Sequence, residues 1–233
     1  SVTGTVSSST LVGGSGADLL SFNNLVEGAS IAGASDGGTA DTANDTVVLS
    51  AGANSNTVSF AEGNDSLSLN RGLSNSTVVA AGGDDTVVAK LTVAGSSIAA
   101  GAGNDSLSIS VLSNSTITGA SGADTITVAG DLLTAQVYGN FANDSVLVGG
   151  AATSGSIYGG KGNDVLNVVG NVVGGNVEGN SGADTITVTG TVSSASVAGG
   201  QGNDTISLAA VDGGDVGGQL GADTMVVGGV LKN

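Results

Sequence analysis

The sequence predicts an all-β protein, a parallel β-solenoid of about eleven coils of roughly 20 residues each. Two observations predict this fold. An aspartate recurs along the whole chain in steps of 19 or 20 residues, after one first step of 27. Behind each aspartate, apolar and polar residues alternate with the period of a strand. A fixed period of this length indicates coils that stack on one another. The aspartate column consists of Asp18, Asp45, Asp65, Asp85, Asp105, Asp124, Asp144, Asp164, Asp184, Asp204 and Asp223.

Each coil is expected to contain two short strands and two turns. After Asp184, residues 185–189 alternate, with Ile186 and Val188 facing inward. The same pattern places Met225 and Val227 inward in the last coil. The second, shorter strand carries one inward β-branched residue seven positions before the next aspartate. This column is Val58, Val78, Ile98, Ile117, Val137, Ile157, Val177, Val197 and Val216. Eleven coils spaced by about 4.8 Å would span roughly 50 Å.

The periodicity indicates one continuous solenoid over residues 1–233, and we expect it to be a segment of a longer repetitive protein. The step of 27 residues predicts an insertion, a surface loop at residues 33–44. A local misalignment of degenerate repeats is the alternative explanation for that step.

The amino-acid composition limits the kinds of binding partner that the protein can have. The chain has 20 acidic residues against four basic ones, a net charge of −16, with no histidine, cysteine or proline. This charge argues against nucleic acid and anionic membranes as partners and favours cations. No apolar run is long enough for a membrane span. The lack of histidine and cysteine removes serine and cysteine triads, and Asp131, Asp212 and Asp215 are expected in solvated bends. We therefore expect no enzyme activity.

The aspartates end glycine-rich turns. Residues 159–164 read Gly-Gly-Lys-Gly-Asn-Asp, residues 199–204 read Gly-Gly-Gln-Gly-Asn-Asp, and residues 13–18 read Gly-Gly-Ser-Gly-Ala-Asp. Glycines such as Gly160, Gly162, Gly200 and Gly202 allow positive φ, so that carbonyl groups can converge with the carboxylate. Calcium prefers such oxygen ligands, whereas zinc would need histidine or cysteine and magnesium demands stricter octahedral geometry. Alternatively, the aspartates only cap the turns.

These turns match the pattern G-G-x-G-x-D followed by an apolar residue two positions on. The sequence thereby resembles the RTX (repeats-in-toxin) calcium-binding β-roll proteins over nearly its whole length. The resemblance implies calcium ligands at the aspartate column and the four glycines, and a bacterial extracellular or cell-surface location. It departs from the family in one respect: the second half of each coil has no regular aspartate. We therefore predict calcium on one edge and a serine- and asparagine-rich turn on the other.

The sequence favours a structural role, with calcium folding and rigidifying a surface-layer, adhesin-stalk or other cell-surface assembly. Such proteins can self-associate into lattices or filaments. Two other functions stay open. The chain could be the calcium-binding module of a secreted enzyme. It could also bind ice, because outward threonines such as Thr125, Thr127, Thr185 and Thr187 form a hydroxyl ladder. Threonine and serine are equally common as ordinary exposed strand residues.

Overall fold

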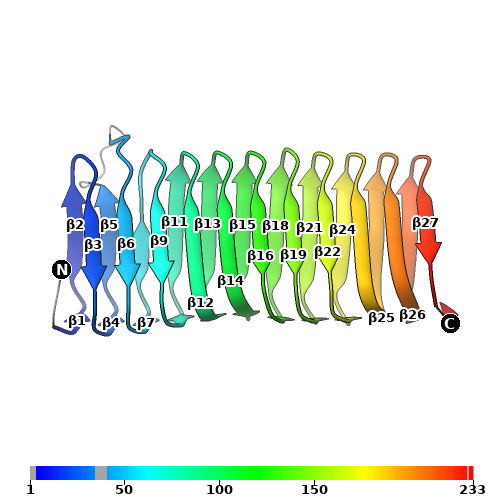
Figure 1. Cartoon of the computed structure of the whole chain (residues 1–233), viewed down its shortest axis with the longest axis horizontal. Coiled ribbons are helices and arrows are strands. Elements are labelled where there is room, and N and C mark those ends of the chain that lie inside the picture. Colours follow the sequence, from blue (N-terminus) through cyan, green and yellow to red (C-terminus); the bar gives the residue numbers. More distant parts are fainter. Residues whose placement is uncertain (1–3, 35–40, 230, 233) are drawn as a thin grey trace.

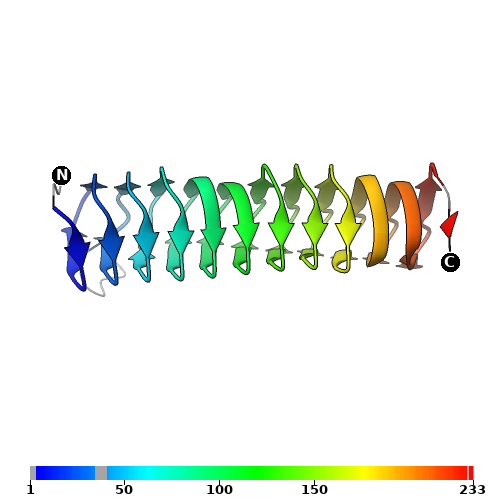
Figure 2. The ribbon, with the colours of Figure 1, turned by 90° about the horizontal axis from the view of Figure 1, so that it is seen from below.

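Three stacks of parallel strands build the computed structural model, with each coil of chain following the last along one axis (Figure 1). The structure describes residues 4–34, 41–229 and 231–232. Each coil runs up a first wall, turns at the aspartate, runs down a second wall and bends through a short strand (Figures 1 and 2). We call the aspartate turns the aspartate edge and the opposite bends the second edge.

The strand bounds follow this three-part coil. The first wall contains β2 (Thr10–Gly14), β5 (Ser30–Ala34), β8 (Thr57–Ser59), β11 (Thr77–Gly82), β13 (Ser97–Ala102), β15 (Thr116–Ser121), β18 (Gln136–Phe141), β21 (Ser156–Lys161) and β24 (Asn176–Ser181). The second wall contains β3 (Leu19–Phe22), β6 (Thr46–Leu49), β9 (Ser66–Leu69), β12 (Thr86–Ala94), β14 (Ser106–Ser113), β16 (Thr125–Val128), β19 (Ser145–Val148), β22 (Val165–Val168) and β27 (Thr224–Val227). The second edge contains β1 (Val6–Ser7), β4 (Val26–Glu27), β7 (Ala53–Asn54), β10 (Leu73–Ser74), β17 (Leu132–Leu133), β20 (Ala152–Thr153), β23 (Val172–Val173) and β28 (Leu231–Lys232). In two coils all three parts join into β25 (Thr185–Gln201) and β26 (Thr205–Leu220).

The parallel solenoid is thus confirmed, with one difference in the coil. The sequence predicted two strands per coil, and the structure adds a third at the second edge, two residues long in most coils. Its members pair in register from coil to coil, as Leu132 does with Leu112 and Ala152. A two-residue strand between bends offers no alternation to read, so the sequence pattern does not reveal it.

The core is a set of aliphatic ladders inside the coil. Val137 pairs with Ile117 and Ile157, and all three have no exposed surface. Each coil alone has only a few such side chains, so burial depends on the neighbouring coils. Met225, which the sequence placed inward, is 41% exposed instead. Its strand β27 pairs on one side only, with β26, so no second neighbour covers it.

The irregular steps are absorbed away from most of the aspartate turns. Both 19-residue coils shift register at the second edge, between Ala89 and Thr92 on β12 and between Val188 and Thr191 on β25. The 27-residue step falls between β5 and β6. Residues 33 and 34 end β5 and residues 41–44 precede β6, whereas residues 35–40 lie outside the described residues, so the loop at 33–44 stays a prediction.

Candidate metal centre

The aspartate side chains link successive coils. The backbone N–H of each aspartate donates to Oδ1 of the aspartate in the following coil. For example, Asp144 N–H donates to Asp164 Oδ1 at 2.8 Å, and Asp164 N–H donates to Asp184 Oδ1 at 2.7 Å. The ladder is unbroken from Asp18 to Asp223. From Asp45 to Asp223, one carboxylate oxygen is therefore committed to the adjacent coil, whereas the capping alternative placed such a bond within the aspartate's own turn.

The second carboxylate oxygen has a different environment. The aspartates between Asp45 and Asp204 are only 1–3% exposed, whereas Asp18 and Asp223 at the ends are half-buried. Oδ2 is buried without any hydrogen-bond partner in Asp18, Asp65, Asp85, Asp105, Asp124, Asp144, Asp164, Asp184 and Asp204. An ionised oxygen buried without a partner is strongly destabilising, so a column of nine such atoms calls for a cation or protons.

A glycine five residues before Asp18, and before each aspartate from Asp124 onwards, makes room for Oδ2 itself. A Cβ added at Gly159 would overlap Asp164 Oδ2, and it would lie 2.8 Å from the carbonyl oxygen of Gly179 in the next coil. The carboxylate oxygen and a main-chain carbonyl oxygen of the next coil therefore both lie close to this glycine. At Asp85 and Asp105 the same position is held by Ala80 and Ala100.

The turn glycines adopt the backbone conformation that the motif predicted. Gly160, Gly162, Gly200 and Gly202 have φ between 114° and 139°, a region that disfavours side chains. Ala142, which replaces the expected glycine before Asp144, reaches a φ of 78°, and Asp144 keeps its place in the ladder. The replacement therefore does not remove this turn from the column.

The electrostatics match the burial. Burial raises the pKa of Asp85 and Asp144 to about 7, and that of Asp65, Asp124 and Asp184 to about 6. The backbone N–H bond to each carboxylate opposes this rise, and the charges of neighbouring aspartates add to it. The pKa values of Asp45, Asp105 and Asp164 are raised for the same leading reason. Near neutral pH the column thus favours protonation or a bound cation.

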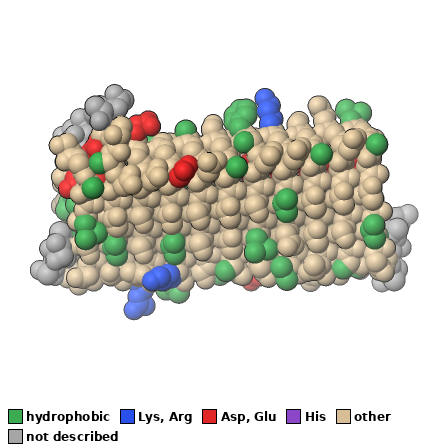
Figure 3. Space-filling view, turned by 45° about the horizontal axis from the view of Figure 1, so that its top comes forward, with side chains coloured by type: hydrophobic (Ala, Val, Ile, Leu, Met, Phe, Trp, Pro, Cys, Tyr) green, Lys and Arg blue, Asp and Glu red, His purple; other side chains and the backbone are tan. Residues whose placement is uncertain are grey.

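The donor atoms suit a hard cation. They are carboxylate and main-chain carbonyl oxygens, the ligands that calcium prefers. Within the described residues, no group of three or more acidic, histidine or cysteine side chains gathers at one point. A bound ion would therefore take much of its coordination from the backbone carbonyls of two adjacent coils. Nine of the 20 acidic side chains are buried in the column, and acidic side chains occupy little of the face in Figure 3.

Sequence reasoning missed two further ladders. On the aspartate edge, the residue before the aspartate contributes: Asn163 Oδ1 accepts from the N–H of Ala183, opposite in direction to the aspartate bonds. On the second edge, Ser76 N–H donates to Ser96 Oγ and Ser96 N–H donates to Ser115 Oγ, all buried. The repetition of asparagine before aspartate could have revealed the first ladder.

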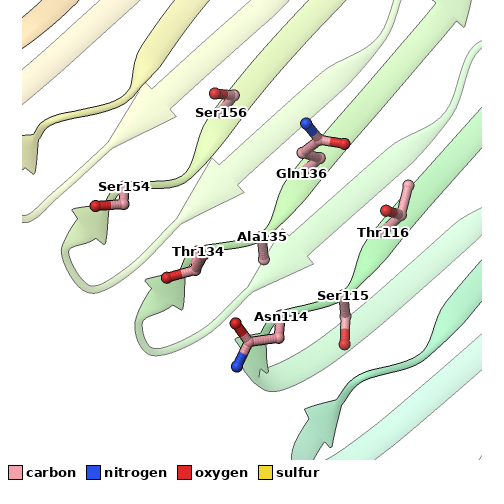
Figure 4. A pocket seen from close by; sticks show the side chains of 8 residues that line it. All are labelled: Asn114, Ser115, Thr116, Thr134, Ala135, Gln136, Ser154 and Ser156. Carbon is pink, nitrogen blue, oxygen red and sulfur yellow. The ribbon is translucent and has the colours of Figure 1, made fainter. Parts of the chain in front are cut away.

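The second edge forms the serine- and asparagine-rich turn that the sequence predicted. Asn75, Asn114, Ser154 and Ser194 occupy its left-handed positions, with φ between 48° and 51°. The buried serine column ends at Ser115, where Ala135 takes over, and a shallow polar depression of about 390 Å³ opens there (Figure 4). The described second edge has no column of acidic side chains like that of the aspartate edge, and calcium on one edge only stays a prediction.

Fold and site together define a cation-binding parallel β-solenoid. The family model of the RTX calcium-binding nonapeptide repeat, four copies long, matches residues 154–168 and 189–210. These two segments thus carry RTX-type repeats, whose ion is calcium. Among the described residues, no helix has the length and apolar character needed to cross a membrane.

A solved structure shares the fold. It is a hyperactive, Ca²⁺-dependent, β-helical antifreeze protein from an Antarctic bacterium, with a TM-score of 0.65 and 20% sequence identity. The match covers 93% of this chain and 82% of that chain. At this identity the likeness concerns the fold alone. Comparison with curated proteins gave no match.

Proposed function

We propose that the chain is an extracellular, calcium-stabilised structural rod from a bacterial cell surface, without catalytic activity. The observation that carries this proposal is the column of buried Oδ2 atoms without partners. Calcium at each inter-coil space would neutralise these atoms and tie adjacent coils together. At most ten ions fit between eleven turns, enough to offset the net charge of −16. Because the walls repeat regularly from coil to coil, we expect the main effect of calcium binding to be a stiffer rod.

The atoms that lie near Oδ2 indicate which groups would bind calcium. We assign Oδ2 of the column aspartates, with carbonyl oxygens of the glycine turns such as Gly179, as ligands. The assignment is best supported from Asp124 to Asp184, where Oδ2 and the carbonyl oxygen of the next coil approach the same glycine. Asp45, Asp65, Asp85 and Asp105 belong to the same column, and we expect weaker binding there.

The location follows from the ion. Extracellular calcium is near millimolar, whereas the cytosol holds far less, so the column would stay unneutralised inside the cell and fold on export. Binding only to the folded state shifts the folding equilibrium by mass action. Assembly into a surface layer, an adhesin stalk or a filament would use the same rod as a building unit.

The test is urea unfolding followed by far-UV circular dichroism in calcium, in magnesium and in chelator. We expect a large rise of the unfolding midpoint in calcium, a small one in magnesium, and the lowest midpoint in chelator. Equal midpoints in calcium and chelator would refute the calcium-stabilised rod. Labelling of intact cells that produce the protein, with an antibody that cannot enter them, checks the location.

A second candidate function is ice binding. Two observations favour it: the shared fold with the antifreeze protein, and the outward hydroxyls of Thr125, Thr127, Thr185 and Thr187 on the second wall. Against it, Leu147 and other apolar residues interrupt this array. Thermal hysteresis of the calcium-loaded protein decides: ice binding requires a freezing-point gap that Thr187→Leu diminishes, and the structural rod requires none. A catalytic domain elsewhere in the full-length gene product would instead make the chain an enzyme module.

A further inference from the structure

Aromatic side chains gather on the outer face of the first wall. Tyr138 on β18 and Tyr158 on β21 are register partners, and their rings stack with centroids 5.0 Å apart and an interplanar angle of 12°. Beside them, Phe141 is 53% exposed, and Lys161 Nζ lies 5.1 Å from the centroid of its ring. The chain has only five aromatic residues, and three of them lie here. None of the three fills the core, so their placement is not explained by folding.

A polar depression lies two coils further along the same face. Its volume is about 240 Å³. Ala198 and Gly200 form its floor, and polar side chains surround them. The walls are the side chains of Glu178, Asn180, Gln201 and Gln219. Tyr158 pairs with Glu178, and Glu178 pairs with Ala198, so tyrosine and floor are two coil spacings apart, roughly 10 Å.

The wall side chains are free to bind a ligand. Within the part of the chain that the structure describes, the side chains of Glu178, Asn180, Gln201 and Gln219 make no hydrogen bond or ion pair. The turn does not need two of them either. Asn180 and Gln219 hold left-handed positions, with φ of 77° and 74°, which Gly160 and Gly200 hold in neighbouring coils. A side chain at such a position is disfavoured, and glycine would serve the fold equally well.

We propose that this face binds a glycan, with one pyranose unit in the depression and the next unit over Tyr158. The three amides and one carboxylate offer both donors and acceptors to sugar hydroxyls. Tyr138 covers one face of the Tyr158 ring, and Glu178 follows one coil on at the other face. The apolar side of a second sugar can pack on that face once the unbonded Glu178 side chain turns outward to bind the sugar hydroxyls. Glu178 and the single nearby cation, Lys161, argue against a phosphorylated ligand. This binding is separate from the calcium-stabilised rod, because it uses none of the column aspartates.

The chain contains its own probe for this site, because Tyr138 and Tyr158 are its only tyrosines and it has no tryptophan. We would titrate the calcium-loaded protein with maltotriose, cellotriose, mannotriose and chitotriose while following tyrosine emission. Saturation transfer from protein to sugar protons gives a second readout. We expect at least one trisaccharide to give a saturable emission change at millimolar concentration together with saturation transfer.

The decisive variant is the double substitution Asn180→Gly with Gln219→Gly, since glycine at these positions preserves the turn. We expect its affinity to fall by about ten-fold or more, as two hydrogen-bonding side chains are lost. Asn140→Gly is the matched control, the same change at the same turn position outside the depression, and should bind as the parent does. Far-UV circular dichroism verifies that all variants fold. No binding of any trisaccharide in both readouts, or equal binding by the double variant, would overturn the proposal.

Discussion

Replacing Asp144 by asparagine should change stability in opposite directions with and without calcium. Asp144 is 2% exposed, its Oδ1 accepts from Asp124 N–H, and its Oδ2 has no partner. An asparagine oxygen can keep the Asp124 bond. Its Nδ2 would take the place of Oδ2 near the carbonyl oxygen of Gly159, which can serve as a hydrogen-bond acceptor. The substitution thus removes a buried charge while keeping the geometry of the turn.

The magnitude follows from the pKa. Burial raises the pKa of Asp144 from 3.8 to about 7, with smaller contributions from the charges of Asp124 and Asp164. One pKa unit corresponds to about 1.4 kcal/mol, so the charge costs up to about 4 kcal/mol above pH 7 without calcium. Water entry and relaxation of the turn reduce this, and we expect Asp144→Asn to stabilise the calcium-free protein by about 2 kcal/mol at pH 8. At pH 5 the folded aspartate is mostly protonated while the unfolded chain is still ionised, so the gain should fall to less than half of its value at pH 8.

The assay is urea unfolding by circular dichroism in chelator at pH 8 and pH 5, and in saturating calcium at pH 8. In calcium we expect the variant to be less stable than the parent, because a ligand is lost. Asp131→Asn is the matched control: Asp131 is exposed at the second edge, and its Oδ1 also accepts from a backbone N–H of an adjacent coil, that of Ala151 in the following coil. If Asp144→Asn destabilised the chelated protein at pH 8 as much as the calcium-loaded one, the reasoning about the buried charge would be wrong.

Three further outcomes are expected. In chelator, the folded protein should gain stability as pH falls from 8 towards 5, because column pKa values raised to about 6 or 7 make the folded state bind more protons than the unfolded chain above pH 3.8; circular dichroism against pH checks this, and a loss of stability over that range would contradict it. Ser96→Ala should cost about 1–2 kcal/mol, because the buried Ser76 N–H loses its acceptor, whereas Ser108→Ala on the exposed face should cost almost nothing in the same urea experiment. Ile157→Ala should cost about 2–5 kcal/mol by opening a cavity between Val137 and Val177, and thermal unfolding should show Val165→Ala, at a 47% exposed site, to be nearly neutral.

Most of the fold could be predicted from the periodicity of the sequence. The alternation after each aspartate placed residues such as Ile186 and Val188 inward, and both are buried. Stacking identical columns was enough to predict the parallel register, because each coil repeats the same length. The sequence alone could not show that the two oxygens of each carboxylate have different roles. Only coordinates separate Oδ1, which holds the adjacent coil, from Oδ2, which is left without a partner.

The outer face was less predictable. Tyr138 and Tyr158 both lie six residues before a column aspartate, so the period alone could have paired them, but a single pair has no repeat to draw attention to it. The depression beside Glu178 depends on small residues in two later coils and on side-chain directions. Such features arise from differences between coils, whereas the fold arises from what the coils share.

The register shifts at Ala89/Thr92 and Val188/Thr191 bear on how such a chain can change over time. Both 19-residue coils lose their residue at the second edge, and the aspartate ladder passes through them unbroken. The second edge therefore tolerates a change in the number of residues per coil, whereas the aspartate edge keeps the same number in both 19-residue coils. A duplication or deletion of one whole repeat would lengthen or shorten the molecule by one step of about 4.8 Å without disturbing its neighbours. The number of column aspartates therefore sets the length of the molecule.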